Sequence, residues 1–215
     1  MSEKPPPGSP PAQGPAPAAV LPALLEHPDV LLRPLTPADA RALFEVTPQD
    51  TFRYFLDWPV EWTLPAFEAW IASRLFKPTS CGMVVIDRRT GRIVGSSSYL
   101  DIDPVHRGVE IGFTWYTPEA RGTRINPASK LLLLEHAFGP MFAGRCERVQ
   151  LKCDGRNERS QRAIAKLGAV REGVLRKHRV LMDGYVRDTV MFSITREEWP
   201  RVREGLHNRL AEAGA

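Results

Sequence analysis

The sequence has few cysteines and no long apolar run. Its three cysteines, Cys81, Cys146 and Cys153, are widely spaced and form no Cys-x-x-Cys pair, which argues against a disulfide framework and against a zinc site. No stretch reaches the roughly 20 apolar residues that cross a bilayer, and the N-terminus lacks the residue order of a signal peptide. We therefore expect reduced thiols, no metal, no membrane partner and a cytoplasmic location.

The sequence also lacks a compact run of cations and the glycine-rich motifs of nucleotide-binding loops. The formal net charge is +4, and the segment from Arg145 to Arg187 holds 12 Lys or Arg against 5 Asp or Glu. These cations are spread through apolar periodic segments and are not interleaved with exposed aromatic residues. The pattern favours a phosphate-bearing small ligand and argues against a nucleic-acid partner.

The length of 215 residues suits one globular domain preceded by a tail. The first 17 residues contain seven of the 20 prolines, with Ala, Gly, Ser and Gln between them, and offer almost no apolar area to bury. We therefore expect a disordered tail over residues 1–25 and a single folded domain over residues 26–215. The sequence leaves a monomer and a homodimer equally open.

Hydrophobic periodicity and turn signals predict alternating strands and helices. A mixed, mainly antiparallel, twisted sheet of about seven strands with helices on both faces follows from this order, so the fold class is α/β in the α+β sense. We expect strands over residues 30–35, 82–87, 93–100, 109–116, 148–153, 170–182 and 185–194, and helices over about 36–46, 65–76, 128–138 and 158–167 and from about 197.

The strand expected over residues 109–116 contains a glycine near a carboxylate. Period-two alternation places Glu110 and Gly112 on one face, together with Thr114 and Tyr116. A glycine inside a strand allows a ligand to approach the backbone closely, here beside Glu110. The alternative is a solvent-facing Glu110 and a bulge at Gly112. The opposite face would carry Val109, Ile111, Phe113 and Trp115.

The loop from Arg121 to Asn126 leads into the next helix. Asn126 suits the N-cap position and Pro127 the first helical position. Because a helix N-terminus offers free N–H groups and the positive end of a dipole, a preceding loop with glycine and two arginines is a natural phosphate cradle. The alternative is an ordinary capped helix with solvated arginines.

A third polar segment begins the helix expected over residues 158–167. Asn157 suits its N-cap, and Asn157, Ser160 and Ile164 lie on neighbouring turns of one face. A ligand with amides or a thiol would give these inward polar groups partners, whereas simple capping is the alternative.

Together these segments resemble the GNAT acetyltransferases, in particular the RimJ/RimL-type branch (ribosomal-protein alanine N-acetyltransferase-like), which acetylates protein N-termini and other amines. The resemblance covers about Val30 to Trp199 and is most specific in residues 109–115, 121–134 and 157–168 and in the Asp183-Gly184 hairpin turn. It implies an acyltransferase that uses acetyl-coenzyme A as co-substrate.

The resemblance also implies positions for coenzyme A. The pyrophosphate would bind the main-chain amides of the loop before the helix. The pantetheine arm would lie alongside the strand over residues 109–116, as an additional β-strand would, and Asn157 would bind that arm. The implied loop residues are Arg121, Gly122, Thr123, Arg124, Ile125 and Asn126, and the implied strand residues are Phe113, Thr114 and Trp115.

Two positions depart from the family pattern. Arg124 stands where glycine is usual, which puts cofactor affinity in doubt, although its charge could reach a phosphate directly. Ile164 stands where many GNAT enzymes carry the tyrosine that protonates the departing thiolate. Ser160, one turn earlier, is the available substitute and a second coenzyme A contact.

The chemistry requires a base, because a protonated amine has no lone pair for attack. We expect Glu110 to take this proton, through water, and a backbone N–H of residues 113–115 to stabilise the oxyanion. Tyr54 and Trp58 are candidates for an acceptor groove in which a peptide N-terminus or a small amine binds. The competing interpretation is a non-catalytic coenzyme A-binding regulatory module.

Overall fold

The computed structural model describes residues 18–75, 77 and 79–212, and residues 1–17 of the expected tail lie outside this range. The described residues form one twisted sheet of eight strands in the order β1-β2-β3-β4-β5-β6-β8-β7. All neighbouring strands are antiparallel except β5 and β6, so the predicted mixed, mainly antiparallel sheet is confirmed. The strands are β1 (Leu25–Glu26), β2 (Val30–Pro34), β3 (Cys81–Asp87), β4 (Arg92–Asp103), β5 (Gly108–Tyr116), β6 (Arg148–Asp154), β7 (Val170–Val180) and β8 (Val186–Thr195).

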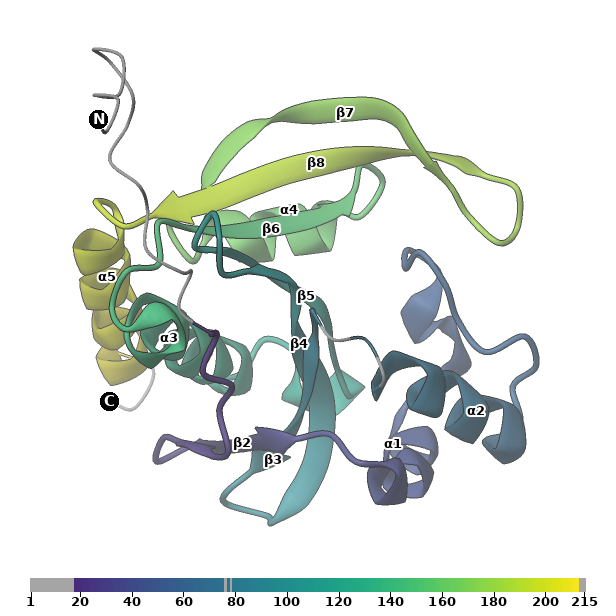
Figure 1. The fold of residues 1–215 in the computed structure, drawn as a ribbon. Helices are drawn as coiled ribbons and strands as arrows, with labels where there is room; N and C mark the ends of the chain where they lie inside the picture. Colours follow the sequence, from purple (N-terminus) through teal and green to yellow (C-terminus); the bar gives the residue numbers. More distant parts are fainter. Residues whose placement is uncertain (1–17, 76, 78, 213–215) are drawn as a thin grey trace, which may run out of the picture.

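Helices cover both faces of the sheet, as predicted (Figure 1). The α-helices are α1 (Ala40–Val46), α2 (Leu64–Leu75), α3 (Ile125–Phe138), α4 (Glu158–Ala165) and α5 (Trp199–Glu212), and the short 3-10 helices are η1 (Pro37–Asp39), η2 (Gln49–Phe52), η3 (Pro118–Ala120) and η4 (Pro140–Phe142). No helix within residues 18–75 and 79–212 is long and apolar enough to cross a membrane.

Each face of the sheet has its own hydrophobic core. The larger core joins α3, α4 and α5 to the sheet, and the smaller, aromatic core joins α1 and α2 to the opposite face. Strand β3 shows the alternation directly, because Met83 and Val85 belong to the larger core and Val84 to the smaller one. The sheet is therefore buried on both sides over its central strands.

Strand β5 changes faces at Phe113, which contradicts the expected alternation. Ile111 packs in the larger core, whereas Phe113 and Trp115 pack in the aromatic core. The register with β4 shifts at this point, and Phe113 has φ +50°. This bulged residue reverses the side chains that follow, so Thr114 no longer shares the face of Glu110 and Gly112.

Two boundaries differ from the sequence analysis. The expected tail boundary at residue 25 falls within a packed segment, because the N–H of Val20 donates to Met141 O (2.8 Å) and β1 pairs with β2 as an eighth strand. Helix α3 begins at Ile125 with Arg124 as its N-cap, so the prediction of Asn126 as N-cap was wrong. Asn126 instead lies in the first turn, where Ile125 already packs into the core.

The close approach of β4 and β5 predicts which strand glycine tolerates a side chain. A Cβ on Gly95 would lie 2.2 Å from the carbonyl oxygen of Trp115, whereas a Cβ on Gly173 in β7 would meet nothing within 4 Å. We expect Gly95→Ala to lower the free energy of unfolding by about 2–4 kcal/mol, and the matched control Gly173→Ala to change it by less than about 1 kcal/mol. Urea unfolding of both variants measures the difference, and equal effects would contradict the packing described.

Candidate active site

The central feature of the site is the divergence of β5 and β6. The two parallel strands pair only from Gly108 with Arg148 to Glu110 with Gln150, and no pairing joins their later residues. Beyond this point, residues 111–116 and 151–154 line a cavity of about 520 Å³. Strand β4 pairs with the outer edge of β5 and β8 with that of β6, so the facing edges present main-chain groups to the cavity. An extended ligand with amide groups would fit between them.

One end of the cavity is basic. It contains Arg121 and Gly122 from the loop before α3, Asn126 from the first turn of α3, and Arg159 from α4. Burial and the neighbouring charge of Arg159 lower the pKa of Arg121, and no carboxylate among the described residues forms a salt bridge with either arginine. Two guanidinium groups near a helix N-terminus favour a bound anion.

Glu110 lies where the two strands separate. Its carboxylate is buried, lies 2.5 Å from Lys152 Nζ and accepts a hydrogen bond from Gln150 Nε2 (3.2 Å). Burial raises the pKa of Glu110, although Lys152 opposes this shift. A carboxylate in this setting can accept a proton near neutral pH more readily than an exposed one.

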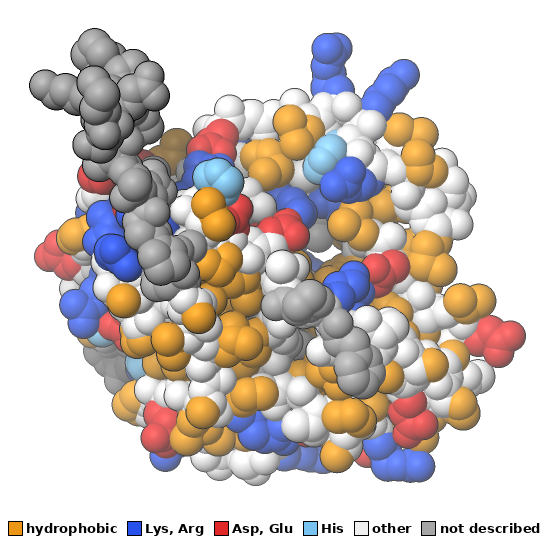
Figure 2. Space-filling model, viewed as in Figure 1, with side chains coloured by type: hydrophobic (Ala, Val, Ile, Leu, Met, Phe, Trp, Pro, Cys, Tyr) orange, Lys and Arg blue, Asp and Glu red, His pale blue; other side chains and the backbone are white. Residues whose placement is uncertain are grey.

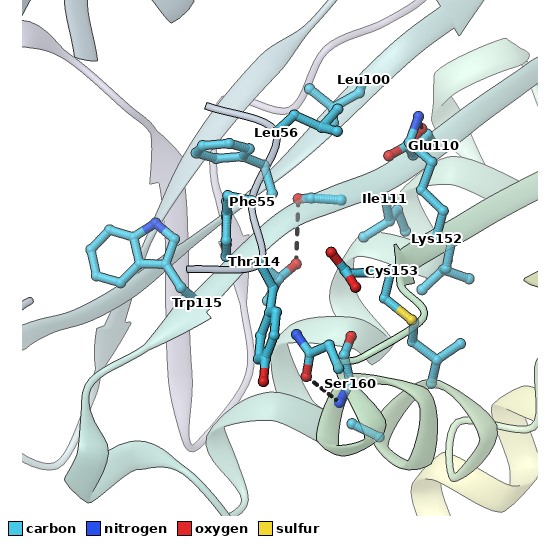
Figure 3. Close-up of a pocket in the computed structure, with 18 of the residues that line it drawn as sticks. Phe55, Leu56, Leu100, Glu110, Ile111, Thr114, Trp115, Lys152, Cys153 and Ser160 are labelled. Atoms are coloured by element: carbon cyan, nitrogen blue, oxygen red, sulfur yellow. Dashed lines mark hydrogen bonds and ion pairs between the residues drawn. The ribbon is translucent and has the colours of Figure 1, made fainter. Parts of the chain in front are cut away.

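The start of α4 forms the wall beside β6. Asn157 Oδ1 accepts the N–H of Ser160 (3.0 Å), which confirms the predicted N-cap. The Ser160 hydroxyl lies near the Cys153 thiol, whose pKa is raised by burial. Figure 3 shows Lys152 beside Glu110 and Cys153 near Ser160, with Thr114 across the cavity from them.

Most of the expected site residues line this cavity. They are Tyr54, Glu110, Phe113, Thr114, Trp115, Arg121, Gly122, Asn126, Asn157 and Ser160. Figure 2 shows a hollow near the centre of the viewed face, with basic and acidic side chains on its rim. Within the described residues, no group of three or more His, Cys, Asp or Glu side chains is arranged to hold a metal ion.

Four expected residues lie elsewhere. The Arg124 side chain does not line the cavity, because its Nε donates to Asp29 (3.0 Å) and its Nη1 to the Leu210 carbonyl (2.5 Å), and these contacts give no support to a direct bond with a phosphate. Thr123 donates to Ala120 O (2.7 Å), and Ile125 is buried in the larger core. Trp58 packs against the aromatic core and does not line the cavity.

Lys130 is a cavity residue that the sequence analysis missed. It is buried on the second turn of α3, and its Nζ donates to Thr114 Oγ1 (2.6 Å) and Ser97 Oγ (3.0 Å). Burial lowers the pKa of Lys130 from its ordinary value of 10.5 to about 7. Its only sequence signal is a lysine next to a run of four leucines, which is equally typical of a residue at the edge of an apolar face.

The chain is similar to acetyltransferases in sequence and structure. A family model described as an acetyltransferase (GNAT) domain matches residues 29–170. A candidate acetyltransferase from T. thermophilus is 39% identical, with a TM-score of 0.82 over 89% of this chain and 98% of that chain. A GCN5-related N-acetyltransferase from Brucella melitensis is 26% identical, with a TM-score of 0.80 over 91% of this chain and 87% of that chain.

A more distant similarity shows the fold alone. RimJ from Mycobacterium smegmatis, solved in complex with CoA-disulfide, is 23% identical, with a TM-score of 0.71 over 89% of this chain and 93% of that chain. Among curated protein sequences, no match to the chain was found.

The buried amine of Lys130 predicts a pH-dependent stability. Between pH 7 and 10.5 the unfolded chain binds a proton at Lys130 that the folded chain does not, so this residue makes the free energy of unfolding rise with pH, by up to about 1.4 kcal/mol per pH unit. Lys130→Met removes the ionisable amine and leaves the Ser97 and Thr114 hydroxyls hydrogen-bonded to each other (2.7 Å). We expect the variant to lack this rise, so that its stability relative to the wild type is greatest below pH 7.

Urea unfolding at pH 6, 8 and 9.5 measures this dependence. Lys166→Met, which removes an exposed lysine just after α4, is the control and should follow the wild-type curve. If the Lys130→Met curve runs parallel to the wild-type curve at all three values, the amine is not neutral in the folded protein.

Proposed function

The chain belongs to the GNAT acetyltransferase family, and we propose that it transfers an acetyl group from acetyl-coenzyme A to a primary amine, by direct attack of the amine on the thioester. The observation that carries the proposal is the open gap between β5 and β6, with a basic pocket at one end and a buried carboxylate at the other. The acceptor would be a protein N-terminal α-amino group or a small-molecule amine.

The groups along the gap suit the chemistry of coenzyme A. The pantetheine arm has amide groups that can pair with the free edge of β5 at residues 113–115, and the amide nitrogen of Asn157 can donate to the same arm. The diphosphate would lie against Arg121, Arg159 and the first N–H groups of α3. The coenzyme in the M. smegmatis RimJ complex supports a coenzyme A ligand for this fold.

The polar groups near the thioester end can carry the proton transfers. Glu110, through a water molecule, would take a proton from the ammonium form of the acceptor, and the free amine would then form a bond to the carbonyl carbon. A backbone N–H of β5 would stabilise the resulting oxyanion. When the carbon–sulfur bond breaks, the thiolate would receive a proton from the Ser160 hydroxyl, which would regain one from the attacking nitrogen as that nitrogen becomes the neutral amide. No covalent enzyme intermediate is needed.

Binding of acetyl-coenzyme A should raise the melting temperature of the wild-type protein, because a ligand selective for the folded state stabilises that state by mass action.

Arg121→Glu places a carboxylate at the proposed diphosphate site. We expect this variant to raise the dissociation constant of acetyl-coenzyme A by about tenfold or more. Arg92→Glu, the same charge change on an exposed residue at the start of β4, should leave the constant unchanged. Equal constants for both variants would move the phosphates elsewhere.

Turnover should depend on Glu110. With acetyl-coenzyme A and a panel of amines that includes peptides with free N-termini, we expect the wild-type protein to release free thiol, which a coenzyme A-binding module would not do. Glu110→Gln should lower kcat/KM by roughly 100-fold near pH 7 and recover partly at high pH, where more of the amine is already neutral.

The matched control for this variant is Asp101→Asn, which removes an exposed carboxylate 3.8 Å from the same Lys152 Nζ. We expect it to alter kcat/KM by no more than about threefold. Near-normal rates for Glu110→Gln from pH 6 to 9 would assign the base to another group or to bulk water.

A further inference from the structure

Arg187 on β8 is a buried cation that forms no salt bridge with a carboxylate of the described residues. It is 4% exposed and lines the cavity between β5 and β6. Its Nε donates to Thr189 Oγ1 (3.1 Å) and its Nη1 to the carbonyl oxygen of Tyr54 (3.3 Å), and both acceptors are neutral. A buried guanidinium normally has a carboxylate partner, because desolvation of an uncompensated charge is costly. Because no carboxylate in the part of the chain that the structure describes fills this role, the geometry points to an anion supplied by a ligand.

The nearby carboxylates are already paired with other residues. Glu110 binds Lys152 (2.5 Å), and Asp154 binds Arg156 (2.8 Å). Burial lowers the pKa of Arg187, while the more distant charges of Asp154 and Glu110 oppose this shift. Arginine nevertheless stays protonated in proteins, so its charge persists inside the cavity.

Arg187 lies on the face of the sheet opposite the larger core. In the register of β6 with β8, Asp154 is opposite Thr189 and Lys152 is opposite Met191, so Arg187 shares the alternation of these residues. The intervening Val190 and Phe192 face the larger core with α3 and α5. The bond to Tyr54 places the guanidinium beneath the loop between α1 and α2, on the same face of the sheet as Glu110.

The rest of the cavity wall has the same charge preference. Apart from Arg187, its lining holds eight Lys or Arg side chains against five Asp or Glu side chains, and one of the eight is Lys130, whose pKa burial lowers to about 7. Arg121 and Arg159 belong to the proposed diphosphate end, but Arg179 lies opposite Arg187 in the register of β7 with β8 and also lines the cavity. A polycationic amine would meet net repulsion here, whereas an anionic group would be attracted.

We propose that Arg187 binds a carboxylate of the acceptor, an inference that rests on the proposed function. The acceptor is therefore an amino acid or another amine with a carboxylate near its nitrogen. The amine lies toward Glu110 and the carboxylate toward Arg187. Since Nη2 of the guanidinium makes no hydrogen bond with a described residue, it can complete a bidentate contact that fixes the orientation of the acceptor.

The test compares alanine with alaninamide, which share the amine and differ in the carboxylate, in the wild type and in Arg187→Gln. We expect the wild type to favour alanine in kcat/KM, after each rate is corrected for the fraction of neutral amine. In the variant, the KM for alanine should rise about 10- to 100-fold, whereas the KM values for alaninamide and acetyl-coenzyme A should change by less than about threefold.

Two further variants separate charge recognition from a loss of folding. Arg187→Lys keeps the charge without the planar fork and should restore part of the preference for alanine. Arg176→Gln removes an exposed arginine from β7 outside the cavity lining and should behave as the wild type. Equal losses for alanine and alaninamide would overturn the proposal, because Arg187 would then only support the loop at Tyr54. A rise confined to the KM of acetyl-coenzyme A would overturn it too.

Thermal stabilisation of the protein–coenzyme A complex by each ligand reports binding without turnover. If no amine releases thiol but alanine stabilises the wild type and not Arg187→Gln, the carboxylate site stands and the proposed activity fails. If neutral amines are acetylated and alanine shows no Arg187-dependent stabilisation, the activity stands and the carboxylate site fails.

Discussion

The site depends on one constraint in the sheet, the separation of β5 from β6 after Glu110 and Gln150. Parallel neighbours normally continue their hydrogen bonds along their length, and a gap leaves edge groups that must find partners elsewhere. Here the outer edges stay paired with β4 and β8, so the gap opens without loss of the sheet. The bulge at Phe113 lies three residues further along β5 and turns Phe113 and Trp115 into the aromatic core.

The opening brings charged groups into a partly buried space and leaves each with a different partner. Glu110 is paired with Lys152, Lys130 is surrounded by hydroxyl groups, and Arg187 is held by a hydroxyl and a main-chain carbonyl. Of these three groups, only Glu110 has a partner of opposite charge. A cavity of this kind favours anionic ligands, which is consistent with a coenzyme that carries phosphates and with an acceptor that carries a carboxylate.

The departure at Arg124 shows how the chain accommodates a bulky residue where glycine is usual in the family. The backbone there is right-handed (φ −68°), so no positive φ is required. The side chain turns to Asp29 and to the C-terminal end of α5, where it links three distant segments. Its charge therefore acts on the packing of the domain, while Arg121 and Arg159 supply the charge in the cavity.

The sequence by itself determined the family, the order of strands and helices, the antiparallel hairpins and the cap at Asn157, because these depend on local periodicity and turn chemistry. Tertiary structure alone decided which side chains enter the cavity. Period-two alternation could not locate the bulge at Phe113, since that shift depends on the register with β4. Lys130 and Arg187 carry no local signal that marks them as cavity residues either, because their burial arises only when α3, β4 and β5, or β8 and the loop at Tyr54, are packed together.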